Sequence, residues 1–192
     1  MQPKPESSAE ETSGAGTSER ASAEDGIKAD PSRVEFRSGE VEGVVVRALR
    51  RFADGRGWLS ELFRDDEVKG EFRPAMAYVS TTLPGVRRGP HEHREQADYF
   101  CFVGPSSFEL RLWDNRPGSA TYGNVLTLVA GEANPLSIII PAGVVHAYRN
   151  VGDVPGFVIN LPNRLYAGAG RREAVDEIRH EDDPATPFRM EE

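Results

Sequence analysis

Between residues 44 and 161 the chain alternates short apolar runs with turn-forming residues. Phe108, Leu110 and Leu112 are separated by Glu109 and Arg111, the period of two that predicts a strand with two different faces. Other runs are more evenly apolar, as expected of strands in the core of a sandwich. These are residues 136–140 and 157–161, while β-rich runs over residues 44–46, 58–63, 77–82 and 99–103 are separated by turn signals. About ten short strands at this spacing predict an all-β fold, a double-sheet jelly-roll barrel.

Two segments depart from the strand pattern. Residues 1–36 carry few large apolar side chains among Ser, Glu, Ala, Gly and Pro, which predicts a disordered tail before a single domain of residues 37–192. Residues 170–180 place Ala174, Val175 and Ile178 at helical spacing, which predicts a short C-terminal helical segment. The expected organisation is therefore one barrel domain with a helical segment near its end.

Charge and composition exclude several classes of partner. The formal net charge of -8 disfavours nucleic acid, and no basic run is longer than two residues. No segment has the apolar length of a membrane span or a secretory signal, so we expect no membrane partner and a cytoplasmic location. The one cysteine, Cys101, lies in an apolar run and is expected to be buried, with no disulfide within the chain.

Three of the four histidines fall in two short segments that also carry turn residues. His91 and His93 are two apart, so on a strand their side chains point to one face. His146 follows a Pro-x-Gly turn, and Asp98 lies five residues after His93. Three imidazoles and a carboxylate in one barrel predict a pocket for metal binding or for proton transfer. His180 stands among charged residues and is expected at the surface.

The two histidine segments resemble the two motifs of the cupin superfamily. The first reads Gly-x5-His-x-His over residues 85–93, with Asp98 where cupins usually carry Glu. The second reads Pro-x-Gly-x2-His-x3-Asn over residues 141–150 and matches at every defined position. The resemblance implies a cupin double-stranded β-helix.

Within the cupins, further segments resemble the dTDP-4-dehydrorhamnose 3,5-epimerase family in order and spacing. They are residues 54–58 with Glu61, residues 88–91, residues 114–123 and residues 182–184. The resemblance implies an isomerase of dTDP-rhamnose-type carbohydrate biosynthesis, acting on a nucleotide sugar. Such an enzyme inverts C3, C5 or both of a dTDP-4-keto-6-deoxy sugar. A neutral histidine removes a proton beside the carbonyl, and a proton returns from the other face.

The family resemblance also implies roles for single residues. His91 occupies the position of the base, and Arg88 that of an arginine near the nucleotide phosphates. Arg56 and Glu61 lie in a segment that the family uses for substrate binding. The other positions expected near the substrate are His93, Tyr99, His146 and Asn160.

The proton donor departs from the family pattern. The donating tyrosine of the family falls at Asn160, whose amide cannot act as an acid, and a lysine expected near the substrate falls at Tyr99. Tyr166 or Tyr99 is therefore expected to supply the proton. Asp98 is expected to orient His91 in place of a late aspartate of the family.

Alternatives stay open at the same residues. The family usually carries His-x-Gln where this chain has His91-x-His93, a pair shared with nucleotide-sugar 3,4-ketoisomerases. The set His91, His93, Asp98 and His146 also suits a divalent transition metal in a metal-binding or non-catalytic small-molecule cupin. One nitrogen lone pair cannot both bind a metal and remove a proton, so His91 does one or the other. The epimerase interpretation needs no cofactor, and hidden edge strands would predict a homodimer.

Overall fold

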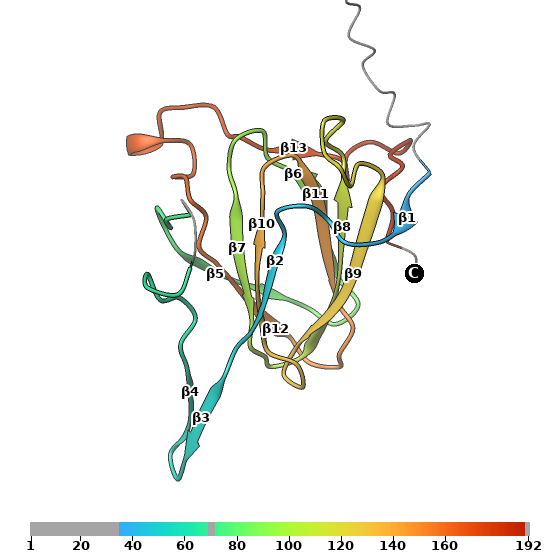
Figure 1. Cartoon of the computed structure of the whole chain (residues 1–192). Helices are drawn as coiled ribbons and strands as arrows, with labels where there is room; N and C mark the ends of the chain where they lie inside the picture. Colours follow the sequence, from blue (N-terminus) through green and yellow to red (C-terminus); the bar gives the residue numbers. More distant parts are fainter. Residues whose placement is uncertain (1–34, 69–71, 191–192) are drawn as a thin grey trace, which may run out of the picture.

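The computed structural model describes residues 35–68 and 72–190, which form two β-sheets packed on each other and a projecting hairpin (Figure 1). The six-stranded sheet runs in the order β1 (Arg37–Ser38), β9 (Asn124–Gly131), β8 (Ser107–Asp114), β11 (Val144–Asn150), β6 (Arg87–Glu92) and β13 (Ile178–Arg179). The five-stranded sheet runs in the order β2 (Val45–Ala48), β10 (Leu136–Ile140), β7 (Asp98–Phe102), β12 (Gly156–Asn160) and β5 (Tyr78–Thr82). The hairpin pairs β3 (Arg51–Asp54) with β4 (Gly57–Ser60). The all-β prediction is confirmed, whereas the predicted disordered tail lies almost wholly in residues 1–34, outside the described residues.

The main apolar core lies between the two sheets. Phe108, Leu110 and Leu112 are buried in it, as the alternating pattern of β8 predicts. The Phe100 ring packs on Tyr148 with centroids 5.9 Å apart and on His146 with centroids 5.6 Å apart. The core therefore continues directly into the histidine-bearing part of the barrel.

Both sheets are also covered on their outer faces. Trp113 on β8 packs against Phe188, with ring centroids 5.9 Å apart. On the other sheet, Tyr99 and Cys101 of β7 pack against the segment that includes Phe72. Because both faces are covered, every residue of β7 is buried, which explains its evenly apolar sequence and confirms that Cys101 is buried.

The prediction of a helix over residues 170–180 is wrong. The structure has only a 3-10 turn at Ala169–Arg171, and Gly170 inside it has φ 66° in the left-handed region. Beyond the turn the chain becomes extended, and Ile178 of β13 pairs with Glu92 of β6. Val175 stays 40% exposed, so the helical spacing of apolar residues had no surface to pack against. Pairing with a sheet edge decided the conformation.

The expectation that His180 is a surface residue is also wrong. Its Nε2 lies 3.0 Å from Glu92 Oε1, and its ring packs on Phe188 with centroids 4.6 Å apart. His180 is thus held on the outer face of β6 by Glu92, which is distant in the sequence and close in the fold. No helix in the described part of the chain has the length and hydropathy that crossing a bilayer requires.

Candidate active site

Three histidine rings converge where β6 and β11 lie side by side. β6 carries His91, and His93 follows directly after the strand ends. His146 on β11 pairs in register with His91. The ring centroids are 4.4 Å apart for His91 and His146 and 5.7 Å apart for His91 and His93. Glu92, between the first two, contacts His180 on the outer face, so the predicted common face of His91 and His93 is confirmed.

Asp98 reaches this cluster from β7 on the facing sheet. Its Oδ2 lies 3.2 Å from His93 Nε2 and 3.3 Å from His146 Nε2. Its Oδ1 accepts hydrogen bonds from Gln96 Nε2 at 2.9 Å and from Asn160 Nδ2 at 2.8 Å. The carboxylate is 1% exposed, so these four neighbours replace the water that it loses.

The backbone around the two rings fixes their tautomers. His146 Nδ1 lies 3.0 Å from the carbonyl oxygen of Val144, and His93 Nδ1 contacts the carbonyl oxygen of Asp176. A carbonyl oxygen only accepts, so both Nδ1 atoms carry hydrogen and both Nε2 atoms face Asp98. Burial alone would lower the pKa of His93, but the hydrogen bond and charge of Asp98 raise it above the usual value.

The pKa of Asp98 is held well below its usual range. Burial alone would raise it, but the adjacent imidazoles of His146 and His93 outweigh this effect. A proton on His93 therefore belongs to a buried imidazolium–carboxylate pair. The pair lies directly beside His91.

His91 differs from the other two rings. It lines the main cavity, and burial, followed by the neighbouring imidazoles of His146 and His93, lowers its pKa to about 2. At physiological pH the ring is therefore neutral and keeps a nitrogen lone pair. A neutral imidazole that faces a cavity has a lone pair free to accept a proton, although so low a pKa also makes the ring a weak base.

Gly89 makes the close packing around His91 possible. A Cβ at this position would lie 2.6 Å from the His146 carbonyl oxygen and 3.0 Å from His91 Nδ1, and the backbone has φ 78°. Only glycine fits both the space and the left-handed conformation. The Gly-Pro step before His91 thus lets β6 approach β11 at the level of the rings.

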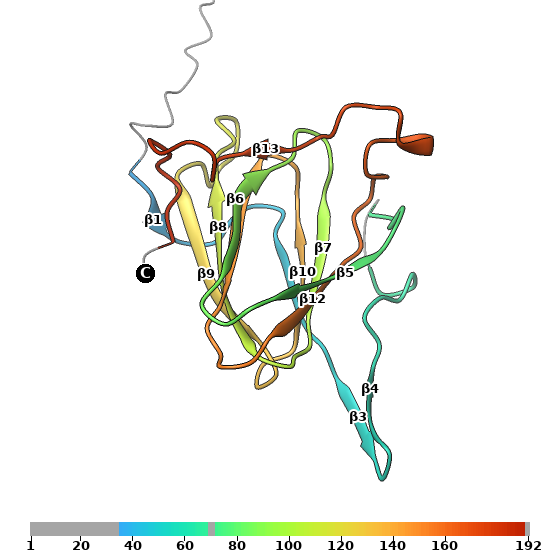
Figure 2. The same ribbon diagram turned by 180° about the vertical axis from the view of Figure 1, so that it is seen from behind.

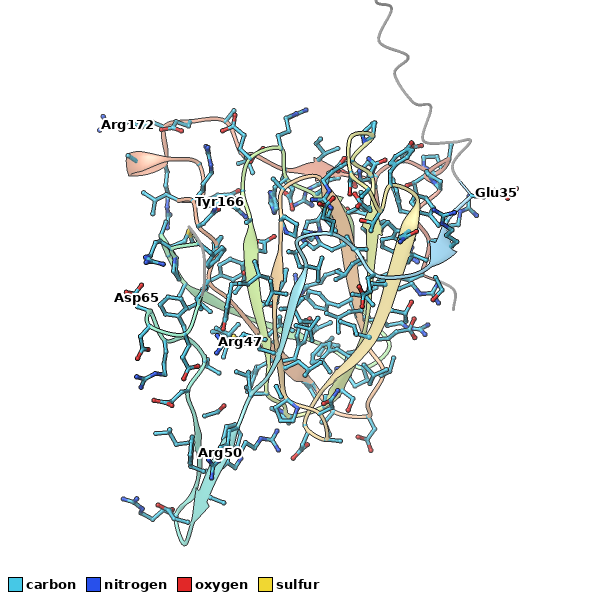
Figure 3. The ribbon with its side chains drawn as sticks, viewed as in Figure 1. Glu35, Arg47, Arg50, Asp65, Tyr166 and Arg172 are labelled. Carbon is cyan, nitrogen blue, oxygen red and sulfur yellow. The ribbon has the colours of Figure 1, made fainter. Side chains whose placement is uncertain are left out.

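The cavity beside His91 has a volume of about 1150 Å³. Its inner wall includes His91, His93, Phe100, Tyr78 and Tyr148. The segment after β12 borders it, and Figure 3 shows Tyr166 and Arg172 on that segment, outside the two sheets. The volume exceeds that of a typical small-ligand pocket, so it has room for a sugar together with a nucleotide.

Arginines are frequent around the cavity. They are Arg87, Arg88, Arg94, Arg164, Arg171 and Arg179. Arg164 and Arg179 pair with Glu95 at 2.6 Å and with Glu177 at 3.0 Å. Arg88 instead donates from Nε to Thr82 Oγ1 and from Nη2 to the Thr81 carbonyl oxygen, which leaves its positive charge without a carboxylate among the described ion pairs. Such a guanidinium suits a phosphate oxygen.

The same histidines could also hold a metal ion. One nitrogen from each ring lies within 4.8 Å of the other two, and buried His146 Nε2 makes no hydrogen bond of good geometry with any described residue. Two nitrogens bound to one transition metal at 2.0–2.1 Å can be at most about 4.2 Å apart. A small movement of the rings would therefore suffice. The three imidazoles fit a divalent metal, and Asp98 lies beside two of them.

The structure brings most of the predicted site residues together. His91, His93, Arg88 and Tyr166 line the cavity, and Asp98, His146 and Asn160 lie directly behind its wall. Asp98 contacts His93 and His146, whereas its predicted partner was His91.

Three predicted site residues lie elsewhere. Arg56 is at the tip of the β3–β4 hairpin, 91% exposed and paired with Asp54, and Glu61 pairs with Arg64. Tyr99 points to the outer face of β7, where its hydroxyl donates to the Leu62 carbonyl oxygen at 2.8 Å. Strand alternation explains this placement, because Tyr99 follows the inward-pointing Asp98.

The sequence interpretation missed two tyrosines of the inner wall, Tyr78 and Tyr148. Residues 77–82 were predicted as a strand, but the pattern did not assign its faces. The side that Tyr78 presents is set by the pairing of β5 with β12, where Tyr78 is opposite Asn160. Asn160 was already predicted to lie near the substrate. Its partner on the neighbouring strand, Tyr78, should therefore lie near the substrate as well.

Comparisons with known proteins agree with this geometry. The model of the dTDP-4-dehydrorhamnose 3,5-epimerase family matches residues 38–182. The probable low-salt glycan biosynthesis epimerase Agl13 of Haloferax volcanii is 41% identical over 128 residues, 66% of this chain and 81% of that protein. The spore coat polysaccharide biosynthesis protein SpsL of Bacillus subtilis is 36% identical over 126 residues, 66% of this chain and 82% of that protein.

A solved structure gives the same fold. A dTDP sugar isomerase from Desulfovibrio desulfuricans has a TM-score of 0.68 with this chain at 24% identity. The match covers 78% of this chain and 91% of the other.

Proposed function

This chain belongs to the dTDP-4-dehydrorhamnose 3,5-epimerase family, and from that premise we propose that His91 is its catalytic base. The protein is a nucleotide-sugar epimerase and therefore an isomerase. The proposed substrate is a dTDP-linked 4-keto-6-deoxy sugar, inverted at C3, C5 or both. The proposed scaffold is the cupin double-stranded β-helix.

One observation carries the proposal: His91 is a neutral imidazole on the wall of a cavity large enough for a nucleotide sugar. The hydrogens on C3 and C5 are acidic because each carbon is next to the C4 carbonyl. When His91 removes one of them, the electrons of the C–H bond pass to the carbonyl oxygen as an enolate. We propose that this enolate forms beside His93, whose ring also lines the cavity and contacts Asp98.

The arginines at the rim give the nucleotide a place to bind. Arg88 keeps its guanidinium charge toward the cavity while Thr82 and the Thr81 carbonyl hold its position. We propose that Arg88 contacts the diphosphate of the substrate, because a fixed guanidinium binds phosphate oxygens in a planar, two-point geometry. This contact would fix the sugar with respect to His91.

Turnover in D₂O tests the proposed function. With dTDP-4-keto-6-deoxyglucose as substrate, we expect deuterium at C3 or C5 together with inversion, read by NMR. A carbonyl shifted to C3 would indicate the 3,4-ketoisomerase alternative. No exchange and no new product would contradict enzymatic action and support a binding cupin.

The convergence of three imidazole nitrogens within 4.8 Å favours a second candidate function, a metal-dependent cupin. His91, His93, His146 and Asp98 would hold a divalent metal that polarises a bound carbonyl. The same assay after chelator treatment and desalting separates the two candidates. The base proposal expects unchanged exchange and less than one metal per chain by elemental analysis. Activity that is lost with the metal and restored by adding it would support the second candidate.

We also propose that the protein is a homodimer. The β3–β4 hairpin projects from the body, and Phe52, Trp58 and Leu59 on it are 43%, 51% and 62% exposed (Figures 1 and 2). β2, which leads into this hairpin, is an edge strand with unpaired backbone groups. A second copy would cover both features. Arg56 at the hairpin tip would then reach a substrate only in the neighbouring copy.

Sedimentation equilibrium checks the proposed dimer. We expect twice the chain mass of 21.1 kDa for the wild type, and a shift toward the single mass for a Trp58→Ser, Leu59→Ser double variant. Val154→Ser is a matched control, since Val154 is 42% exposed but lies in the turn between β11 and β12, outside the hairpin. A wild-type monomer at micromolar concentration would contradict the proposal. A cytoplasmic location stays a prediction from the sequence.

A further inference from the structure

Inversion of a carbon requires that a proton leaves from one face and that another proton is added to the opposite face. His91 can remove a proton from one face, and the new proton must arrive from the opposite face. His91 lies on β6 of the six-stranded sheet, so the second group should come from the five-stranded sheet across the cavity. Figure 2 shows β6 and β5 in these separate sheets.

We propose that the Tyr78 hydroxyl on β5 is the acid that returns the proton, an inference that rests on the proposed epimerase function. Tyr78 lines the cavity together with His91. It belongs to the five-stranded sheet, and its neighbour Asn160 on β12 contacts Asp98 behind the histidines. The base and the acid therefore approach the sugar from different walls.

The hydrogen bonds of Asn160 determine whether the Tyr78 hydroxyl acts as a donor or as an acceptor toward it. Asn160 Oδ1 accepts from the backbone N–H of Tyr99 at 3.1 Å, which fixes the orientation of the amide. Its Nδ2 donates one hydrogen to Asp98 Oδ1 at 2.8 Å and the other to the Tyr78 hydroxyl oxygen at 3.0 Å. Both amide hydrogens are used, so the Tyr78 oxygen is an acceptor here. Its own hydrogen remains available for donation into the cavity.

The other tyrosines are less well placed. Tyr148 lies on β11, in the same sheet as His91, and its hydroxyl is 3.4 Å from Ser80 Oγ. Tyr166 lies on the segment after β12, outside the five-stranded sheet, and is 58% exposed against 45% for Tyr78 (Figure 3). Tyr99 points to the outer face of β7. Tyr78 alone among these four combines the facing sheet, the cavity wall and a held oxygen.

The step balances as follows. His91 takes a proton from the carbon, and the C–H electron pair becomes part of the enolate. The enolate then forms a C–H bond on its other face with the proton of Tyr78, and the carbonyl is restored. Tyr78 is left as a phenolate and His91 as an imidazolium, and water in the cavity returns one proton and removes the other. Removal of water from the hydroxyl raises the pKa of Tyr78, which keeps the proton in place until the enolate forms.

A Tyr78→Phe variant tests the proposal in D₂O. We expect inversion to fall by about 10²–10⁴-fold, while deuterium still enters the carbon with retention of configuration. Retained exchange is expected because His91 can exchange its proton with solvent and return it to the same face. Tyr122→Phe, outside the cavity, is the matched control and should invert as the wild type does. If the Tyr78→Phe protein does not fold, Tyr78→Leu is measured in its place, and the same loss of inversion with retained exchange is expected.

Three results would overturn the inference. The first is a folded Tyr78→Phe protein that inverts at the wild-type rate. The second is a folded variant that loses exchange and inversion equally, which would indicate a role in binding. The third is loss of inversion, with retained exchange, in Tyr166→Phe and not in Tyr78→Phe. Failure of the proposed function is distinguishable, because the wild type itself would then show no exchange.

Discussion

Replacing His91 by asparagine is expected to reduce deuterium incorporation into the keto sugar by about 10²–10⁴-fold. Asparagine fills similar space, but its amide nitrogen has no basic lone pair to accept the carbon-bound proton. The variant should still fold, because His91 is a cavity-lining ring whose neighbours His93 and His146 keep their contacts with Asp98. NMR of the substrate in D₂O measures exchange, and thermal unfolding monitors the fold.

His180→Asn is the matched control for that variant. His180 is also a partly buried histidine, but it contacts Glu92 on the outer face of β6. Its replacement should leave exchange within a factor of a few of the wild type after correction for folded protein. Unaltered exchange in His91→Asn, or equal losses in both variants, would contradict the assignment of the base.

Replacing Asp98 by alanine is expected to lower the free energy of unfolding by about 3–5 kcal/mol. The carboxylate is 1% exposed and accepts hydrogen bonds from the side chains of Gln96 and Asn160. It also lies 3.2 Å from His93 Nε2 and 3.3 Å from His146 Nε2. Its removal leaves the amide donors of Gln96 and Asn160 without their acceptor and the Nε2 atoms of His93 and His146 without their charged partner. Chemical denaturation followed by tryptophan fluorescence measures the loss.

Asp153→Ala provides the comparison for Asp98. Asp153 is exposed in the turn before β12, so the same truncation should change the free energy of unfolding by less than about 0.5 kcal/mol. A cost below about 1 kcal/mol for Asp98→Ala would show that the carboxylate does not hold the cluster together. It would also contradict the charged pair with His93.

Local patterns were sufficient to predict part of the fold and of the site. The common face of His91 and His93 follows from strand alternation alone, and burial of Cys101 follows from an evenly apolar run. The Pro-x-Gly turn before His146 indicated that a third imidazole would join the site. In the structure, β11 places His146 opposite His91. These features depend on few residues that are close in sequence.

The residues whose positions were not predicted correctly from the sequence depend on contacts between different segments of the chain. Tyr78 enters the site because β5 pairs with β12, and Tyr99 leaves it because Asp98 points inward. The helical spacing around Val175 was outweighed by the pairing of β13 with β6. His180 is covered by Phe188, which no local pattern reveals.

The placement of one base and one acid on opposite walls has a consequence for stereochemical outcome. Such a pair serves one carbon at a time, and C3 and C5 flank the carbonyl on its two sides. A second inversion therefore requires the sugar to pivot about its link to the diphosphate between turnovers of the pair. In a chamber of about 1150 Å³, the freedom of that pivot decides between a single and a double epimer. Product stereochemistry would then be tuned by bulky side chains that block rotation, with the reacting groups left unchanged.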